Sequence, residues 1–206
     1  MCGRFTLTDP SRIRAAFQRF RFDEFSHYRL PRFNVAPAQM VLGVRNDGRA
    51  AVEAMHWGID GRINARAETI ERAQTPRRCI IFADGFYEWS AGKPSYFSLR
   101  DGVPFAFAGL WQAQGDAAPA CTIVTCRSND VVAAIHDRMP VILPPEAVDV
   151  WLSSEDLPHD VRGAMLRPYE APEMRSRAVS TRLNDARYDA PDILLHEDPV
   201  QQSFGL

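Results

Sequence analysis

The sequence predicts an α+β fold: a single domain with a curved or barrel-like, mostly antiparallel mixed β-sheet and short flanking helices. The chain has 206 residues, of which 46% are hydrophobic and 24% charged, which is enough for one substantial core. Short β-type segments recur between turn residues, and short helical segments are interleaved with them. We therefore expect residues 1–206 to form one domain.

The first predicted element is a helix in the segment TDPSRIRAAFQRF at 8–20. Asp9 or Thr8 would cap its N-terminus, and Pro10 suits the first turn. The apolar residues, beginning with Ile13 and Phe17, recur on one face, so we expect that face to be buried.

A Pro-rich loop follows, and the remaining elements are short. The predicted strands are 39–45 and 51–57, joined by a turn at 46–49, then 78–83, 95–99, 104–110, 121–126, 139–143 and 173–180. The predicted helices are 128–136, 145–152 and 159–166. The last 26 residues are polar apart from apolar anchors such as Ile193 and Leu194.

Charge and cysteine usage restrict the class of protein. The net charge of −2 argues against a generally basic nucleic-acid binder, yet the part of the chain up to Arg78 holds 14 Arg against 8 acidic residues. This asymmetry predicts a basic face, unless folding mixes the two parts of the chain. No signal peptide and no apolar run of about 18 residues is present, so we expect a cytoplasmic protein without membrane contact. The four cysteines form no disulfide framework or C-x-x-C pair, and we expect no metal or cofactor.

Cys2 directly follows the initiator Met in MCGRF. Removal of Met1 would leave Cys2 with a thiol and a free α-amine on adjacent carbons, which no internal cysteine has. The alternative is an ordinary buried thiol near the start of a strand.

Three further polar positions are candidates for chemistry. Asn64 and Arg66 are two residues apart, so on a strand both face one side. Glu88 lies between aromatic residues, where desolvation raises a carboxyl pKa and suits a general acid. His136 lies between a predicted helix and a strand, and can transfer protons near neutral pH. Taken singly, each has a structural explanation: a surface or turn position, an ion pair with arginine, or a helix-end histidine.

Together these stretches resemble the SOS response-associated peptidase (SRAP) family. The matching segments are MCGRF at 1–5, PRFNVAPAQ at 31–39, INARAET at 63–69, RCIIFADGFYEW at 78–89, FAGLW at 107–111, HDRMPVIL at 136–143 and VSTRLNDARYDAPDIL at 179–194. They occur in order over nearly the whole chain.

The resemblance implies recognition of abasic sites in single-stranded DNA and a covalent bond through the N-terminal cysteine. By motif, Cys2 would be the nucleophile, Glu88 and His136 the acid and base, and Asn64 a positioning residue. It further implies a monomer that associates with the nucleoid when bound to DNA, in an SOS-type DNA-damage context.

The resemblance also implies which residues hold the DNA. Arg4, Arg66 and Arg138 would bind phosphates, and Trp57 and Trp89 would stack on flanking bases. Phe86 is another aromatic candidate, with a core position as its alternative.

The α-amine suits this chemistry because its ordinary pKa is about 7.7–8.0, so part of it is neutral at pH 7. It would form an imine with the sugar aldehyde, and the thiol would then close a thiazolidine ring. Weak strand-cleaving lyase activity is a reasonable side reaction, and the family name reflects a proposed peptidase activity linked to removal of Met1.

The sequence departs from the family pattern in two places. Only IDGRI separates Gly58 from Asn64, where family members usually have a longer loop with a further tryptophan, and Phe82 stands where proline is common. Two other functions remain open at this point. One is an amide-bond hydrolase with an N-terminal cysteine nucleophile, and the other is a module that binds single-stranded DNA without chemistry.

Overall fold

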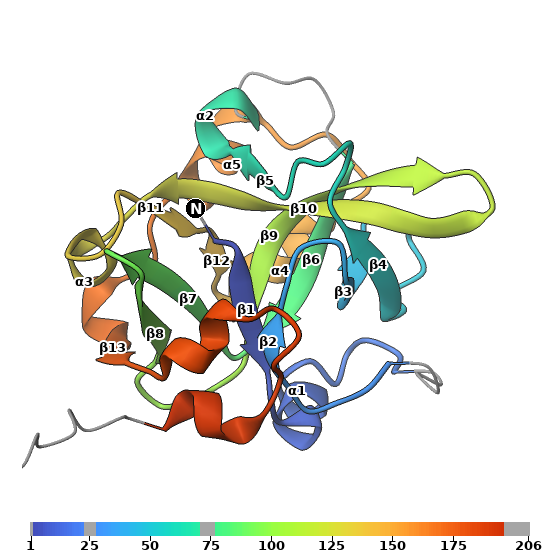
Figure 1. Ribbon diagram of the computed structural model, residues 1–206. Helices are drawn as coiled ribbons and strands as arrows, with labels where there is room; N and C mark the ends of the chain where they lie inside the picture. The colour runs from blue at the N-terminus through green and yellow to red at the C-terminus, as the bar shows by residue number, and fades with distance from the viewer. Residues whose placement is uncertain (1, 23–27, 71–76, 196–206) are drawn as a thin grey trace, which may run out of the picture.

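The computed structural model describes residues 2–22, 28–70 and 77–195. Its strands form two sheets that lie against each other (Figure 1). One sheet is closed into a barrel and carries short additional strands, and the other is open and antiparallel. This is the α+β fold with a barrel-like mixed sheet and short helices that the sequence predicts.

The described strands of the barrel follow the order β10-β4-β3-β6-β9, and β9 pairs again with β10 to close it. The β4–β10 pair is parallel, and the other pairs are antiparallel. Their bounds are Met40–Arg45 for β3, Glu53–Trp57 for β4, Arg78–Ala83 for β6, Phe105–Gln114 for β9 and Ala117–Arg127 for β10.

Three short strands extend the barrel sheet. They are β5 (Asn64–Arg66), β11 (Arg138–Pro140) and β12 (Ile142–Leu143). β5 pairs in parallel with β10, β11 pairs with the same strand in the antiparallel sense, and β12 pairs with β9. The C-terminal half of β10 thus has β5 on one edge and β11 on the other.

The open sheet has the strand order β13-β8-β7-β1-β2 among the described residues. Its strands are β1 (Arg4–Leu7), β2 (Arg32–Val35), β7 (Gly85–Ser90), β8 (Lys93–Leu99) and β13 (Met174–Ala178). All of its pairs are antiparallel.

Aromatic side chains join the two sheets. Phe5 and Phe86 are directly opposite each other on β1 and β7 and are fully buried. The Phe5 ring lies 5.2 Å from that of Trp57 and 5.7 Å from that of Phe107, both on the barrel. Because side chains alternate along a strand, Glu88 shares the barrel-facing side with Phe86.

The helices are short and lie around the sheets. They are α1 (Pro10–Ala16), α2 (Ala67–Ile70), α3 (Asp130–Ala133), α4 (Pro145–Trp151) and α5 (His159–Met165), with 3₁₀ turns η1 (Ala171–Glu173), η2 (Thr181–Asn184) and η3 (Pro191–Leu194). Asp9 caps α1 by accepting hydrogen bonds from the backbone N–H groups of Ser11 and Arg12, as an N-cap aspartate does. No helix of the described residues is long and apolar enough to span a bilayer.

The segment 180–194 is fastened to the open sheet by a buried asparagine. The side-chain amide of Asn34 donates to the carbonyls of Leu183, Asp185 and Tyr188. Arg4 donates from one nitrogen to both the Asn34 oxygen, at 2.9 Å, and the Leu183 carbonyl, at 2.8 Å. Asn34 has no exposed surface, so this network links the C-terminal segment directly to β1 and β2.

Several boundaries differ from the sequence predictions. The helix expected over 8–20 ends at Ala16, because Phe17 leaves helical geometry at φ −120° and ψ 31°. The Pro-rich loop contains β2, which is extended because it pairs with β1. β7 was not predicted either; its first four residues are all buried, so it lacks the alternation that marks a half-exposed strand.

Candidate active site

Cys2 lies just before β1 and has no exposed surface. Its Sγ is 3.9 Å from the Arg4 carbonyl oxygen. Burial raises the pKa of the Cys2 thiol well above its ordinary value, and the negative charge of Glu88 raises it further. The cysteine is therefore held as a neutral thiol close to a carboxyl group.

Asn64 fixes the backbone of Cys2. Its side-chain amide donates a 2.9 Å hydrogen bond to the Cys2 carbonyl oxygen. Asn64 is the first residue of β5 and is opposite Ile123 of β10. Its own Oδ1 is buried and accepts no hydrogen bond from any described residue. This leaves one strong acceptor beside Cys2.

Glu88 approaches the same place from β7, with 2% of its surface exposed. Burial raises the pKa of its carboxyl group above the ordinary value, and the nearby His136 opposes this rise. The sequence predicts the raised pKa from the aromatic neighbours, and this prediction is confirmed. A carboxyl group of this kind holds its proton at a higher pH than a surface glutamate does, as a general acid requires.

His136 follows α3 and precedes β11. Its Nδ1 accepts a 2.9 Å hydrogen bond from the backbone N–H of Arg138, which places the proton of the neutral ring on Nε2. The same Nδ1 is 3.1 Å from a carboxylate oxygen of Asp137. Nδ1 cannot accept from the backbone and donate to Asp137 at the same time, so the protonated ring would favour the Asp137 contact. About 29% of the side chain is exposed.

The four residues come from four separate segments that β10 and β1 bring together. β5 carries Asn64 along one edge of β10, while β11, directly after His136, runs along the other. β7 pairs with β1 so that Tyr87 is opposite Arg4, which sets Glu88 beside the start of β1. Figure 1 shows the N-terminal end of β1 next to β5, β10 and β11.

The three arginines expected to bind phosphates have different surroundings. Arg66 is exposed on β5 and makes no ion pair with a described residue. Arg138 donates to both carboxylate oxygens of Glu68, at 2.6 and 3.0 Å, and to the Thr125 carbonyl. Arg4 is committed to the Asn34 network, on the outer face of the open sheet. Of the three, only Arg66 offers an uncommitted guanidinium in this structure.

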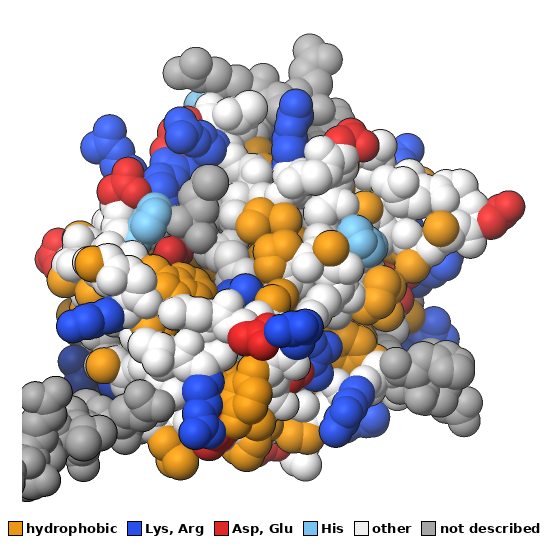
Figure 2. Space-filling model, viewed as in Figure 1, with side chains coloured by type: hydrophobic (Ala, Val, Ile, Leu, Met, Phe, Trp, Pro, Cys, Tyr) orange, Lys and Arg blue, Asp and Glu red, His pale blue; other side chains and the backbone are white. Residues whose placement is uncertain are grey.

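Glu68 is a site residue that the sequence reasoning missed. The Arg138 hydrogen bonds lower the pKa of its carboxyl group, and the charge of Arg66 acts in the same direction. Glu68 therefore stays ionised between two arginines. Its position two residues after Arg66 in INARAET is the signal that could have identified it. Figure 2 shows Lys and Arg side chains gathered over the α2 and β11 side of this face.

The aromatic residues expected to stack on bases differ in their exposure. Trp57 is fully buried, and its indole N–H donates to the Ile63 carbonyl at 2.9 Å. A ring without exposed surface offers no face to a base, so the structure does not support stacking by Trp57. Phe86 is equally buried. Trp89 is partly exposed and donates to the Asn184 side chain at 2.8 Å, so it remains a stacking candidate.

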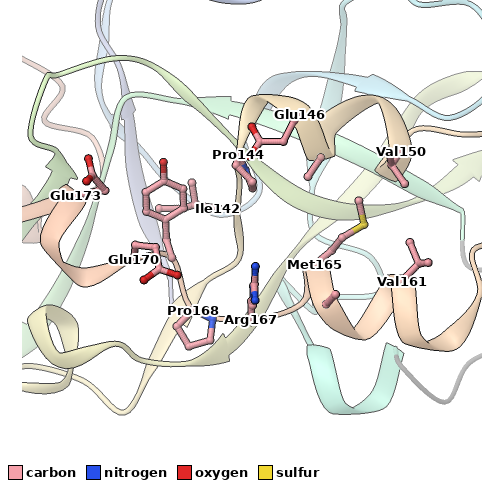
Figure 3. Close-up of a pocket in the computed structure, with 13 residues that line it drawn as sticks. Ile142, Pro144, Glu146, Val150, Val161, Met165, Arg167, Pro168, Glu170 and Glu173 are labelled. Atoms are coloured by element: carbon pink, nitrogen blue, oxygen red, sulfur yellow. The ribbon is translucent and has the colours of Figure 1, made fainter.

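A cavity of about 600 Å³ lies elsewhere on the molecule, between α4, α5 and the segment 167–173 (Figure 3). It is lined largely by apolar side chains such as Val150, Val161 and Met165. None of the four candidate catalytic residues borders it, so cavity size does not locate the chemistry in this protein.

Solved structures share this arrangement of barrel, open sheet and short helices. A protein from Bacteroides thetaiotaomicron superposes with a TM-score of 0.80 at 21% identity, over 95% of this chain and 100% of that one. A protein from Bordetella bronchiseptica gives a TM-score of 0.69 at 26% identity, over 87% and 100% of the two chains. The fold is thus one that known proteins adopt.

The sequence comparison gives the family itself. The family model described as SOS response associated peptidase (SRAP) matches residues 1–186, and the chain belongs to this family. Abasic site processing protein YoqW of Bacillus subtilis is 35% identical over 94% of this chain and 99% of its own length. Abasic site processing protein YedK of Escherichia coli is 30% identical over 75% and 81%. The resemblance recognised in the sequence motifs is confirmed.

Proposed function

We propose that this protein processes abasic sites in single-stranded DNA by forming a thiazolidine crosslink through Cys2 once Met1 has been removed. The observation that carries the proposal is the convergence of Asn64, Glu88 and His136 on the buried Cys2, which becomes the N-terminal residue when Met1 is removed. The names of the curated relatives, all abasic site processing proteins, support the lesion as substrate.

The bond changes balance without a cofactor. The neutral α-amine of Cys2 adds to the C1′ aldehyde of the opened sugar, and loss of one water molecule gives an imine. The thiol sulfur then adds to the imine carbon while its proton passes to the imine nitrogen. The product is a five-membered ring containing both the nitrogen and the sulfur of Cys2.

The surrounding groups suit each proton transfer. Glu88, with its raised pKa, protonates the ring oxygen of the closed sugar while the C1′ hydroxyl proton passes to water, and the ring opens to the aldehyde. His136 is placed to carry protons during loss of water. The unused Oδ1 of Asn64 can accept an N–H of the Cys2 amine and orient its lone pair toward the aldehyde.

The buried thiol explains the order of steps in this proposal. Because burial raises the pKa of Cys2, little thiolate is present to attack the aldehyde first. The amine therefore reacts before the thiol, and the thiol needs a base only in the second step. The ionised form of Glu88, left after it has protonated the sugar, can supply that base.

We assign single-stranded DNA as the substrate because the sugar of the lesion must reach a buried cysteine. A base-free sugar in a duplex remains inside the stack, whereas a single strand can present it to a buried cysteine without unstacking. Arg66 and the partly exposed Trp89 are the residues best placed to hold the flanking nucleotides.

The test is a denaturing gel of processed protein mixed with a single-stranded oligonucleotide that carries one abasic site. Wild type should give a heat-resistant shifted band, and an oligonucleotide without the lesion should give none. Cys2→Ser retains the amine, so it should give a band only after borohydride reduction of the imine. Cys121→Ala, which removes another buried thiol, should behave as wild type.

A heat-resistant band from Cys2→Ala would contradict the proposal. Absence of a band from wild type whose intact mass confirms loss of Met1 would do so as well.

A further inference from the structure

A second basic region lies on the open sheet, away from Cys2. Arg175 and Arg177 are both exposed on β13. They are opposite Ser98 and Tyr96 of β8, so all four side chains share one face of the sheet. Two adjoining cavities of about 270 and 180 Å³ are lined by these four residues. We call this feature the β13 groove.

The side chains that line the β13 groove are held in position by contacts with one another. Ser98 is 3% exposed, and its Oγ accepts a 3.1 Å hydrogen bond from Arg175 Nε. The guanidinium carbon of Arg177 lies 5.3 Å from the centre of the Tyr96 ring, so the ring holds that side chain by a cation–π contact. Arg177 Nη1 also donates to the Leu194 carbonyl, and both guanidinium groups retain further nitrogen donors.

In the larger cavity of the groove, no acid of the described part of the chain balances the arginine charges. Neither Arg175 nor Arg177 forms an ion pair there, and the same is true of Arg12, which borders the smaller cavity. Two acids border that smaller cavity and contribute negative charge to it, and each also accepts hydrogen bonds from neutral groups. Asp84 accepts hydrogen bonds from the Thr8 backbone N–H and hydroxyl, and Asp9 caps α1. No acid lines the larger cavity.

We propose that the β13 groove binds backbone phosphates of the DNA strand that leaves the abasic site. Arginine is the side chain best suited to phosphate oxygens, because its planar fork can donate two parallel hydrogen bonds. Arg175 and Arg177, which form no ion pair with a described residue, lie beside the buried Ser98 hydroxyl in the larger cavity, which no acid lines, and this arrangement can take an anion. The proposal rests on the proposed function, because the position of the abasic site at Cys2 determines which part of the DNA strand reaches the groove.

The distance from Cys2 sets where along the strand the contact falls. Glu88 is opposite Ser95, and Ser95 is opposite Ala178, the residue next to Arg177. Two strand spacings, about 10 Å, separate Glu88 from Ala178 across the sheet, so the contact falls some nucleotides away from the lesion. Glu88 faces the barrel, whereas Arg177 faces the other side, so the strand must pass around the β13 edge of the sheet.

The test compares Arg175→Gln/Arg177→Gln with Arg19→Gln/Arg49→Gln. The control removes the same charge from two exposed arginines that already pair with Asp149 and Asp47. Each protein is titrated with oligonucleotides that carry a non-reactive tetrahydrofuran analogue of the abasic site. One oligonucleotide has about 20 nucleotides and the other about three, which are longer and shorter than the span of about 4–16 nucleotides typical of a single-strand site.

We expect the β13 double variant to bind the long oligonucleotide about tenfold more weakly at low salt, with a salt slope smaller by about 1.4, the value for two lost phosphate contacts. Binding of the short oligonucleotide, and the control variant on both, should match wild type. Unchanged affinity for the long strand, or an equal loss on both lengths, would overturn the proposal.

Two further measurements separate the possible failures. If wild type forms no adduct with the reactive lesion, the proposed function fails, whatever the groove does. If inorganic phosphate at constant ionic strength raises the Tm of wild type but not of the double variant, and the DNA titrations show no length dependence, the groove holds a free anion and the strand assignment is wrong.

Discussion

The side-chain amide of Asn64 holds the carbonyl oxygen of Cys2 at 2.9 Å. This bond constrains the backbone of the cysteine and leaves its nitrogen and sulfur out of the contact. Asn64 is itself fixed by the register of β5 on β10. Asn64 lies more than 50 residues after Cys2 in the sequence and is opposite Ile123 of β10. The backbone of Cys2 is therefore positioned by a distant strand of the barrel sheet.

Replacing Asn64 with Ala should slow adduct formation about fivefold, because a hydrogen bond worth about 1 kcal/mol no longer orients Cys2. Asn64→Asp should be at least as slow, since a carboxylate cannot donate to the Cys2 carbonyl. Single-turnover adduct rates measure this. Asn46→Ala is the matched control, because Asn46 bonds Arg78 and Trp111 away from the site. Equal rate losses in both variants would point to general destabilisation.

Glu88→Gln should make the protein more stable at neutral pH. The folded state holds the Glu88 proton more tightly than the unfolded state, because burial raises its pKa. Wild-type stability therefore falls as pH rises from the ordinary glutamate pKa through the raised value, and Gln removes this loss. The Tm difference should be near zero at about pH 4 and should reach a gain of about 3–5 °C for each pKa unit of the rise. A Tm difference that does not change with pH would contradict the assignment.

The Asn34 network should matter for stability rather than for DNA contact. Asn34→Ala removes three donated hydrogen bonds and leaves the carbonyls of Leu183, Asp185 and Tyr188 without that partner. We expect a loss of about 3 kcal/mol in the free energy of unfolding, measured by urea denaturation. Amide exchange should accelerate first in 180–194. The more exposed Asn184→Ala, measured alongside, should lose less than about 1 kcal/mol.

Glu68 should weaken DNA binding by competing with phosphates for arginine. Arg138 is held by both Glu68 oxygens, so Glu68→Gln should free its charge and tighten binding of single-stranded DNA. Arg66→Gln should reduce the salt slope by about 0.7, the value for one lost phosphate contact. Anisotropy titrations over a range of salt concentrations measure both effects. Weaker binding by Glu68→Gln would show that the Arg138–Glu68 pair has a structural role that DNA binding needs.

Local patterns in the sequence were sufficient for much of the fold. The Asp9–Pro10 start of α1 depends only on neighbouring residues, and it is present as predicted. β2 depends on pairing with β1, and β7 is buried on both faces, so neither gives a periodic signal. The 28–38 segment contains prolines and appears loop-like until a partner strand is placed beside it.

Some properties of the candidate site also follow from neighbouring residues, whereas others depend on the fold. The raised pKa of Glu88 follows from its aromatic neighbours, and the shared face of Asn64 and Arg66 follows from their spacing. The commitment of Arg4 to Asn34 and of Arg138 to Glu68 involves partners 30 and 70 residues away. Motif resemblance supplies residue types at positions, but only the folded chain determines which guanidinium groups already have hydrogen-bond or ion-pair partners.

The attachment of β5 to β10 has a consequence for the shortened segment between Gly58 and Asn64. Asn64 is located by its ladder with Ile123, and Trp57 is located by the core and by its bond to the Ile63 carbonyl. The intervening residues only have to close the gap, so their number can change at a small entropic cost without moving the reactive centre. The loop is thus an exchangeable part: its length can change while Asn64 and Cys2 keep their relative positions.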